Sequence, residues 1–453
     1  MFELSDLMKA AGARLIRKGS CDKFNGVSTD SRTINKGEIF IALIGATFDG
    51  HDYINDVIKK GASAVIVSKM IKTSKDFNIL FVRDTSKALM DLARFYRNQY
   101  SIPMVAVTGS TGKTTTKDMI RDVLSVDYSV FKNPGTQNNY IGLSSALLKI
   151  SDKHNACVLE LGTNHFGEIA CLGKIARPQV SVITNIGPSH LEFLKDLDGV
   201  LREKKSIADY LVGPKILLLN GDDSLLRKLK LSNDVKVFYY GMKNNCDFMA
   251  KDISIANNKV CFKVNGHKFC LNSLGRFNVY NALSAIACGI IFGVDMLKIN
   301  KAIKDFKFPK QRLNMIVCKK FSIIDDTYNS NPLSFRAALD TLLAFKPKGR
   351  KIVVMGDMLE LGEGSLELHK NIGSLISKKP VDIFVTLGKL SMVAANEARS
   401  QSNRHKGIFS FENKESLVDF LKEEVKIGDV LLIKGSRLLK MEEIVNQLVK
   451  NAL

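Results

Sequence analysis

A glycine-rich turn followed by a lysine and a hydroxyl residue is the strongest candidate for chemistry in this chain. Residues 105–119 read VAVTGSTGKTTTKDM, in which an apolar run leads through two glycines into a segment with helical periodicity. Glycines let the backbone approach an anion, and the free N–H groups at a helix N-terminus attract one. We therefore expect Lys113 to reach the β- and γ-phosphates of a nucleotide and the Thr114 hydroxyl to bind Mg²⁺.

The loop departs at one position from the general phosphate-loop pattern GxxxxGK[ST], which has glycine where this chain has Val107. The remaining TGxxGKT is a narrower variant. A structural turn with an incidental lysine is disfavoured, because strand, glycines, lysine and helix follow in the required order. The predicted nucleotide-binding residues of the loop are Thr108, Gly109, Ser110, Thr111, Gly112, Lys113, Thr114 and Thr115.

Two further polar residues follow apolar strands. Glu160 ends the run CVLE, and His190 follows the next strand in TNIGPSH. Ligand sites of α/β proteins open at the carboxyl ends of strands, so both residues are candidate Mg²⁺ ligands. Taken singly, each has a structural alternative, a strand-end carboxylate and a hydrogen-bonded histidine. The segment 202–211, REKKSIADYL, is expected to be helical, and by itself it indicates a solvated basic helix face.

Strand-like and helix-like runs alternate along the chain, which predicts an α/β fold with largely parallel sheets. We expect three domains: a smaller α/β domain over 1–84, a central domain with a phosphate-loop-type parallel sheet over 85–310, and a Rossmann-like domain over 311–453. Residues 85–100 form a connector helix in this division. A helix is expected over 1–19 and another over 277–293, with an antiparallel ribbon around 246–270. Strands are expected at 37–45, 62–67, 104–109, 156–162, 180–187, 215–221, 321–326, 350–357, 382–388 and 429–435.

Composition narrows the class of protein. The chain has 453 residues and a net charge of +20. Its lysines are spread throughout, which favours a solvated basic surface that also suits anionic substrates over a nucleic-acid interface. No apolar run is long enough to span a bilayer and the N-terminus lacks the order of a secretory signal, so we expect a cytoplasmic protein. Eight cysteines without a CxxC pair predict reduced thiols, with neither a zinc site nor a redox dithiol.

Together these segments resemble the Mur ligases, the amide ligases of peptidoglycan precursor synthesis. The similarity runs from about residue 26 to residue 448. The segments that carry it are VSTDSRTINKGEIFIALIGATFDGHDYI, TGSTGKTTTKDM, GTQNNYIG, ELGTNHFGEI, NIGPSHLEF, GRFNVYNALSAIA, DDTYNSNP, MGDMLELG and KGSRLLKMEEIV. Each is moderately specific alone, and their common order makes the signal highly specific.

The resemblance implies a reaction. In this family ATP phosphorylates a peptide carboxylate, and an amine then attacks the acyl phosphate to form an amide. It implies UDP-N-acetylmuramoyl-tripeptide and D-alanyl-D-alanine as substrates, with ATP and two Mg²⁺ ions. We also expect a monomer that binds no nucleic acid and has no transmembrane segment. Lysine and diaminopimelate both stay open as the third residue of the tripeptide.

The resemblance also implies roles for single residues. Lys113 matches the phosphate-binding lysine, while Thr114, Glu160 and His190 match the magnesium ligands. Lys204 in REKKS aligns with a lysine that CO₂ carbamylates in the pattern (R/K)AKAE, although Ser206 stands where glutamate is usual. The expected catalytic residues are thus Lys113, Lys204 and His190, with carbamylated Lys204 as a further metal ligand.

Other residues align with substrate contacts of the family. For ATP these are Asn281 at the adenine, beside Phe277 in place of a usual histidine, and Arg312 and Asp326 from the third domain. Because ATP partners lie on two domains, we expect these domains to close on binding. The UDP substrate is expected at Ser31, Arg32, Thr47, Thr136, Asn138 and Asn139, and D-alanyl-D-alanine at Asn329, Asn331 and Arg437. Acceptor-side or structural roles are expected for Asp357, Glu360, Lys434 and Ser436.

Three alternatives compete with this interpretation. The ligase that adds the third peptide residue typically carries a DNPR signature, which does not occur here. Folylpolyglutamate synthetase lacks a UDP-binding first domain, whereas this chain has a candidate for one. A non-catalytic nucleotide- or nucleic-acid-binding protein on a degenerate ligase fold would have lost Lys113, Glu160 or His190, and all three are present.

Overall fold

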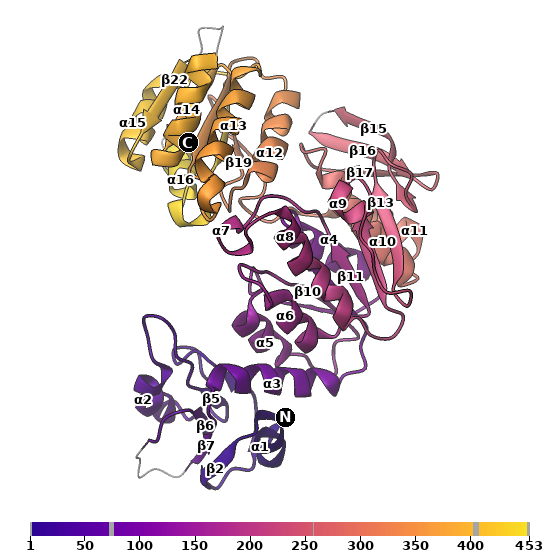
Figure 1. Cartoon of the computed structure of the whole chain (residues 1–453), viewed down its shortest axis with the longest axis vertical. Helices are drawn as coiled ribbons and strands as arrows, with labels where there is room; N and C mark the ends of the chain where they lie inside the picture. Colours follow the sequence, from indigo (N-terminus) through magenta and orange to yellow (C-terminus); the bar gives the residue numbers. More distant parts are fainter. Residues whose placement is uncertain (1, 72–76, 257, 402–406, 451–453) are drawn as a thin grey trace.

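The computed structural model describes residues 2–71, 77–256, 258–401 and 407–450. Within these ranges the chain forms three bodies along the long axis, with the N-terminal body at the bottom of Figure 1 and the C-terminal body at its top. The prediction of an α/β protein is confirmed, because each body is built on a mainly parallel sheet. Among the described residues no helix is both long enough and apolar enough to cross a membrane.

The N-terminal body comprises β1 (Phe2–Glu3), α1 (Leu4–Ala11), β2 (Arg14–Arg17), β3 (Lys23–Phe24), β4 (Val27–Ser28), β5 (Ile39–Ile41), the 3₁₀ helix η1 (Gly50–Tyr53), α2 (Ile54–Lys59), β6 (Ala64–Val67) and β7 (Asn78–Phe81). Its five-stranded sheet has the order β2-β7-β6-β5-β4, with β2 antiparallel and the other strands parallel. A separate pair joins β1 and β3.

The expected helix over 1–19 is wrong beyond its first turns. Helix α1 ends at Ala11 because Gly12 adopts a left-handed conformation with φ of 60° and caps the helix. Gly12 donates its backbone N–H to the carbonyl of Met8. The chain then continues as β2, which pairs with β7, so the second half of the predicted helix is an edge strand.

The middle body comprises α3 (Thr85–Asn98), β8 (Met104–Thr108), α4 (Lys113–Leu124), β9 (Val130–Lys132), α5 (Tyr140–Leu147), β10 (Ala156–Glu160), α6 (Glu168–Ala176), β11 (Val180–Ile183), α7 (Leu191–Leu194), α8 (Leu197–Lys205), η2 (Ser206–Tyr210), β12 (Ile216–Asn220), α9 (Ser224–Arg227), β13 (Lys236–Gly241), β14 (Phe248–Met249), β15 (Lys251–Ala256), β16 (Lys259–Val264), β17 (His267–Leu271), α10 (Asn278–Ile291) and α11 (Met296–Asp305). Its parallel sheet has seven strands in the order β14-β13-β12-β11-β8-β10-β9.

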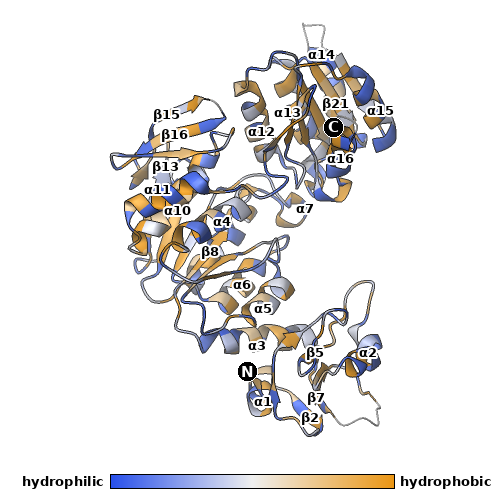
Figure 2. Cartoon of the chain, turned by 180° about the vertical axis from the view of Figure 1, so that it is seen from behind, coloured by the Kyte–Doolittle hydropathy of each residue, from blue (hydrophilic) through white to orange (hydrophobic). Residues whose placement is uncertain are grey.

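Alternate residues of the central strands face opposite sides of this sheet, as strand geometry requires. On β8, Ala106 joins the core formed with α3, α5, α6 and α8, whereas Val105 and Val107 join the core formed with α4, α10 and α11. Both faces are therefore covered by helices, and the strands read as continuous apolar runs. Figure 2 shows this hydrophobic colour along the strands of the middle and C-terminal sheets.

The predicted antiparallel ribbon is confirmed as the three-stranded sheet β15-β16-β17. The expectation that all cysteines are reduced thiols is wrong for one pair, because Cys261 and Cys270 form a disulfide in the structure. The two residues lie directly opposite each other in the β16–β17 register, which places their Cα atoms 4.1 Å apart. The spacing of the cysteines along the sequence does not predict this register between the two strands.

The C-terminal body comprises β18 (Asn314–Val317), β19 (Ser322–Asp325), α12 (Pro332–Ala344), β20 (Lys351–Gly356), η3 (Gly362–Gly364), α13 (Ser365–Ser377), β21 (Ile383–Leu387), α14 (Lys389–Gln401), β22 (Gly407–Phe411), α15 (Lys414–Glu424), β23 (Val430–Lys434), η4 (Arg437–Leu439) and α16 (Glu442–Lys450). Its six-stranded sheet has the order β18-β19-β23-β20-β21-β22, with only β18 antiparallel. Every strand predicted from the sequence contains an observed strand.

Candidate active site

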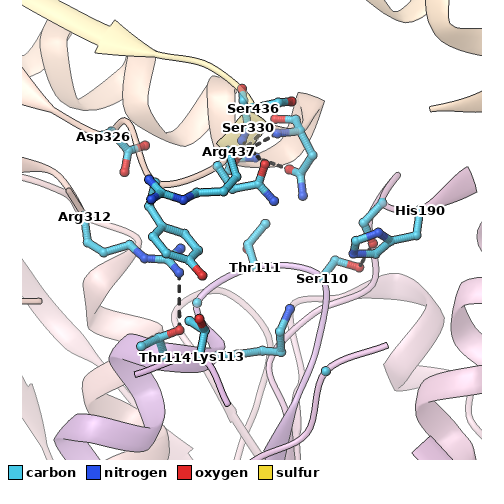
Figure 3. Close-up of a pocket in the computed structure, with 18 of the residues that line it drawn as sticks. Ser110, Thr111, Lys113, Thr114, His190, Arg312, Asp326, Ser330, Ser436 and Arg437 are labelled. Carbon is cyan, nitrogen blue, oxygen red and sulfur yellow. Dashed lines mark hydrogen bonds between the residues drawn. The ribbon is translucent and has the colours of Figure 1, made fainter. Parts of the chain in front are cut away.

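One cavity of about 330 Å³ opens where the carboxyl ends of β8 and β10 meet the C-terminal body. Residues from segments more than 300 positions apart line it, as Figure 3 shows for both of its sides. The predicted residues that line it are Ser110, Thr111, Gly112, Lys113, Thr114, Thr115, Thr136, Asn138, Glu160, His190, Arg312, Asp326, Asn329, Asn331, Glu360, Lys434, Ser436 and Arg437. The fold thus brings most of the candidate site residues together.

The phosphate loop joins β8 to α4 and is held in place by its neighbours. Thr111 donates its backbone N–H to Asn185 Oδ1 at 3.0 Å, and Asn185 Nδ2 donates to Thr111 Oγ1 at 2.9 Å. Gly109 has φ of 144°, and a Cβ there would lie 1.9 Å from Thr184 Oγ1, so only glycine fits. The loop is therefore shaped before any nucleotide arrives.

Lys113 lies inside this loop. Its Nζ donates to the carbonyl oxygen of Gly109 at 2.8 Å. Burial lowers the pKa of Lys113, while the Glu160 carboxylate opposes that shift and Arg312 adds to it. A partly buried ammonium with one hydrogen bond keeps two donors for a further acceptor, which suits an anionic ligand in the cavity.

Glu160 is a buried carboxylate at the end of β10, with 1% exposure. Its Oε1 accepts from Asn138 Nδ2 at 2.7 Å, whereas its buried Oε2 has no hydrogen-bond partner among the residues that the structure describes. An unpaired buried carboxylate oxygen is costly, and a cation satisfies it directly.

His190 also lines the cavity, and its Nδ1 lies 2.6 Å from Glu360 Oε2 of the C-terminal body. Hydrogen bonding to His190 lowers the pKa of Glu360. Within the described residues there is no group of three His, Cys, Asp or Glu side chains that could hold a metal. One carboxylate and one threonine hydroxyl still fit Mg²⁺, which takes the rest of its ligands from phosphates and water.

Lys204 lies behind the cavity on α8 and is 1% exposed. The expectation of a solvated basic helix face is therefore wrong for this residue. Burial lowers its pKa well below the ordinary value, and the charge of Lys113 lowers it further against the opposing effect of Glu203. Glu203 fixes α8 in place by accepting from Gly167 N at 2.7 Å and Ile169 N at 2.6 Å.

Arg312 connects the C-terminal body to the phosphate loop. Its Nη2 donates to Thr114 Oγ1 at 3.3 Å, the contact drawn as a dashed line in Figure 3. The guanidinium lies 3.8 Å from the ring centroid of Tyr328. Behind it, Lys434 Nζ bonds Asp326 Oδ2 at 2.6 Å, and burial lowers the pKa of Lys434.

Comparisons with known proteins decide the family. Three family models match in chain order: "Mur ligase family, catalytic domain" over residues 23–97, "Mur ligase middle domain" over 107–289 and "Mur ligase, glutamate ligase domain" over 311–437. A Bacillus subtilis protein named UDP-N-acetylmuramoyl-tripeptide–D-alanyl-D-alanine ligase is 35% identical, over 95% of this chain and 94% of its own. This chain belongs to the Mur ligase family.

Further Mur ligases agree with this assignment. The Escherichia coli protein of the same name is 32% identical over 96% of both chains. A crystal structure of MurF from Acinetobacter baumannii superposes with a TM-score of 0.91, at 29% identity and 99% coverage of both chains. MurF from Thermotoga maritima in complex with ADP gives a TM-score of 0.83, at 29% identity over 94% of this chain and 98% of its own.

Several predicted residues of this Mur ligase do not line the cavity. Ser31, Arg32 and Thr47 belong to the N-terminal body, where Arg32 is exposed and pairs with Asp30. Thr108 and Gly109 precede the part of the phosphate loop that lines the cavity.

Two predicted asparagines are engaged in structural bonds. Asn139 caps α5 by accepting from Gly142 N at 2.8 Å. Asn281 is 4% exposed, and its Oδ1 accepts from Thr116 Oγ1 at 3.0 Å behind the loop. Neither asparagine lines the cavity. Asn281 instead lies beside the first turn of α4, where it bonds Thr116.

The residues predicted for the acceptor side are engaged in hydrogen bonds or an ion pair within the protein. Asn331 caps α12 by accepting from Ser334 N, and Asn329 accepts from Ser330 N. Asp357 accepts from Ser391 N, and Ser436 Oγ accepts from Leu359 N. Arg437 pairs with Glu442 at 2.6 Å at the cavity rim.

Sequence reasoning missed several residues that shape the site. Asn185 orders the phosphate loop, and Tyr328 supports Arg312. Ser330, at the cavity wall, has a buried hydroxyl without a hydrogen-bond partner in the described part of the chain. Tyr328 and Ser330 lie inside the motif DDTYNSNP, and Asn185 lies inside TNIGPSH. Motif membership could have flagged them, but their partners come from distant segments.

Proposed function

We propose that this Mur ligase joins D-alanyl-D-alanine to UDP-N-acetylmuramoyl-tripeptide with the conversion of ATP to ADP and phosphate. The observation that carries the proposal is nearly full-length similarity, at 30–35% identity, to proteins with this named activity. The ADP complex of the Thermotoga maritima relative supports ATP as the phosphate donor. Retention of Lys113, Glu160 and His190 in one cavity supports catalysis over mere binding.

The chemistry proceeds in two balanced steps. A carboxylate oxygen of the tripeptide attacks the γ-phosphorus of ATP, which gives an acyl phosphate and ADP. The free amine of D-alanyl-D-alanine then attacks the acyl carbon, the C–O bond to phosphate breaks, and the amine proton is lost. Lys113 and Arg312 converge on the position of the phosphates and neutralise their charge, so the work of the protein is alignment and electrostatics.

Glu160 Oε2 and Thr114 Oγ1 are the oxygens that would hold Mg²⁺ beside the phosphates. When bound, this ion withdraws electron density from the phosphoryl group. His190 and Lys204 are proposed for a second ion. Burial lowers the pKa of Lys204 and so increases the share of the uncharged amine, which is the form that reacts with CO₂ to give a carbamate. That supports carbamylation of Lys204.

The remaining roles are part of the same proposal. Thr136 and Asn138 would contact the muramoyl portion of the substrate, with Asn139 beside them, while Ser31, Arg32 and Thr47 would bind the UDP portion from the N-terminal body. Asn281 would bind adenine only after leaving its bond to Thr116. On the acceptor side, Arg437 is the cation proposed for the dipeptide carboxylate, flanked by Asn329 and Asn331. We propose a cytoplasmic location, because ATP and the UDP-linked substrate are cytoplasmic nucleotides, and we propose that the protein is a monomer.

Phosphate release tests the proposal. Purified protein is given ATP, Mg²⁺ and UDP-N-acetylmuramoyl-tripeptide, with and without D-alanyl-D-alanine, and the amide product is identified by mass spectrometry. We expect release that depends on both the tripeptide and the dipeptide, and tripeptides ending in lysine or diaminopimelate are compared in parallel. Release that D-alanyl-D-alanine does not stimulate would contradict this function and favour one of the sibling ligases.

A further inference from the structure

Lys117 is a buried lysine to which the proposed nucleotide chemistry assigns no role. It lies one turn after Lys113 on α4, so both side chains leave the same side of the helix. Lys113 lines the cavity and Lys117 does not. Its side chain is 1% exposed. Because lysines are almost never fully buried without partners, the bonds of Lys117 indicate its role.

The Lys117 ammonium bonds the backbone of the segment 133–139, which we call the β9–α5 loop. Its Nζ donates to the carbonyl oxygens of Asn133 at 3.0 Å and Gly135 at 2.9 Å. The adjacent Asp118 carboxylate is 3.9 Å away and is bonded by Lys132 at 2.6 Å. Lys117 therefore joins helix α4 to this loop through directed hydrogen bonds rather than through a close ion pair.

The β9–α5 loop is tied to Glu160 at two further points. Asn133, which is fully buried, accepts from Glu160 N at 2.9 Å and donates to Glu160 O at 3.1 Å. Asn138 Nδ2 donates to Glu160 Oε1 at 2.7 Å. The same loop carries Thr136 and Asn138 into the cavity. Its position thus decides where one wall of the cavity lies and how the Glu160 carboxylate is turned.

We propose that Lys117 is a positioning residue that fixes the β9–α5 loop to the phosphate-binding helix and so sets the geometry of Thr136, Asn138 and Glu160. The inference rests on the proposed function, in which Thr136 and Asn138 face the UDP-tripeptide. Three N–H donors on a flexible stem let a lysine bond two carbonyls at once. An apolar side chain of the same length would fill the space and remove this donor from the carbonyls of buried Asn133 and exposed Gly135.

The first test follows the loop without any substrate. Hydrogen exchange measured by mass spectrometry compares wild type with K117M, K117R and the matched control K149M, whose lysine is exposed on the same body. We expect amide exchange over 133–139 to rise about tenfold in K117M, to stay near wild type in K117R, and to be unchanged in K149M. K117Q, which keeps a donor without the charge, replaces K117M if that variant does not fold.

The second test separates positioning from general damage to the fold. For K117M we expect the KM for UDP-tripeptide to rise and kcat to fall, with kcat/KM reduced by roughly 10- to 100-fold, as for residues that orient a ligand-binding carboxylate. The Kd of a non-hydrolysable ATP analogue, measured in EDTA without Mg²⁺, should stay within about twofold, because Lys113 is untouched. K117R should recover most of the lost kcat/KM.

Two results would overturn the proposal about Lys117. Unchanged loop exchange in K117M overturns the proposal. Equal losses in ATP-analogue binding and in tripeptide kinetics, with a lower melting temperature, also overturn it, because they indicate a merely structural lysine. If wild-type protein shows no dipeptide-dependent phosphate release, the proposed function fails, and the exchange experiment still tests the hold of Lys117 on the loop.

Discussion

The middle body meets its two neighbours in different ways. Its junction with the N-terminal body is apolar: Phe2, Leu7, Leu89 and Leu92 belong to one buried cluster that continues into the middle body, and Phe2 stacks on Tyr96 at 4.6 Å. Its junction with the C-terminal body has a smaller apolar part, in which Leu274 and Phe277 pack on the C-terminal core. At the cavity this second junction has polar contacts, chiefly Arg312 to Thr114 and His190 to Glu360.

The difference indicates which junction is built to move. Apolar area at the first junction would have to be exposed to water if the bodies separated, which is costly. At the second junction, hydrogen bonds between the two bodies can be replaced by hydrogen bonds to water or to a ligand at a small net cost in free energy. We therefore expect closure on ATP and substrate to take place between the middle and C-terminal bodies, while the N-terminal body keeps its place on α3.

The largest effect is expected from the apolar junction. Leu92 is 1% exposed on α3, so L92A should lower the free energy of unfolding by about 2–5 kcal/mol through lost burial and a cavity. Denaturant unfolding monitored by circular dichroism measures this. The KM for ATP of the folded fraction should not change. A loss below about 1 kcal/mol would contradict a packed junction.

The polar junction should show the reverse pattern. R312M removes a cation beside the phosphate loop, and we expect kcat to fall about 100-fold or more, as when a charge-stabilising donor is removed from an active site. The melting temperature should change little because the contact is a single hydrogen bond. Steady-state phosphate release and thermal denaturation together test this, with R336M on the exposed face of α12 as a control. A large loss of stability in R312M would break the contrast between the junctions.

Acid should weaken the same junction. Because its folded-state pKa is depressed, Glu360 contributes stability that is present above its ordinary pKa of 4.5 and is lost as the pH falls through the lower folded value. We expect the radius of gyration from small-angle scattering to increase below about pH 4.5, and E360Q to show the wider form already at neutral pH. If E360Q is as compact as wild type at neutral pH, the contact between His190 and Glu360 does not hold the two bodies together.

The smallest effect is expected at the N-terminal body. Arg32 is exposed and pairs with nearby Asp30, so R32A should leave the melting temperature unchanged. If Arg32 contacts the UDP portion, the KM for UDP-tripeptide should rise about tenfold, the cost of one charge-assisted hydrogen bond, while the KM for ATP stays constant. Initial rates over a range of both substrates measure this. An unchanged KM would remove Arg32 from the substrate site.

Local sequence patterns were sufficient to predict those parts of the site that lie within one continuous segment of the chain. The order of strand, glycines, lysine and helix in 104–124 predicted the phosphate loop, and the strand ends predicted where Glu160 and His190 would lie. The same patterns failed at Gly12, because a left-handed cap ended a helix whose periodicity continued. They also failed at Cys261 and Cys270, because the pairing depends on strand register.

The sequence by itself determined the α/β class, the loop and the family, because periodicity, glycine positions and motif order are properties of neighbouring residues. Only the tertiary structure decided that His190 meets Glu360 across 170 positions, that Lys204 is buried, and that Lys117 holds the β9–α5 loop. These facts depend on which elements pack together and how far each side chain is removed from water. A pattern of residue types along the sequence specifies neither the packing of distant elements nor the burial of a side chain.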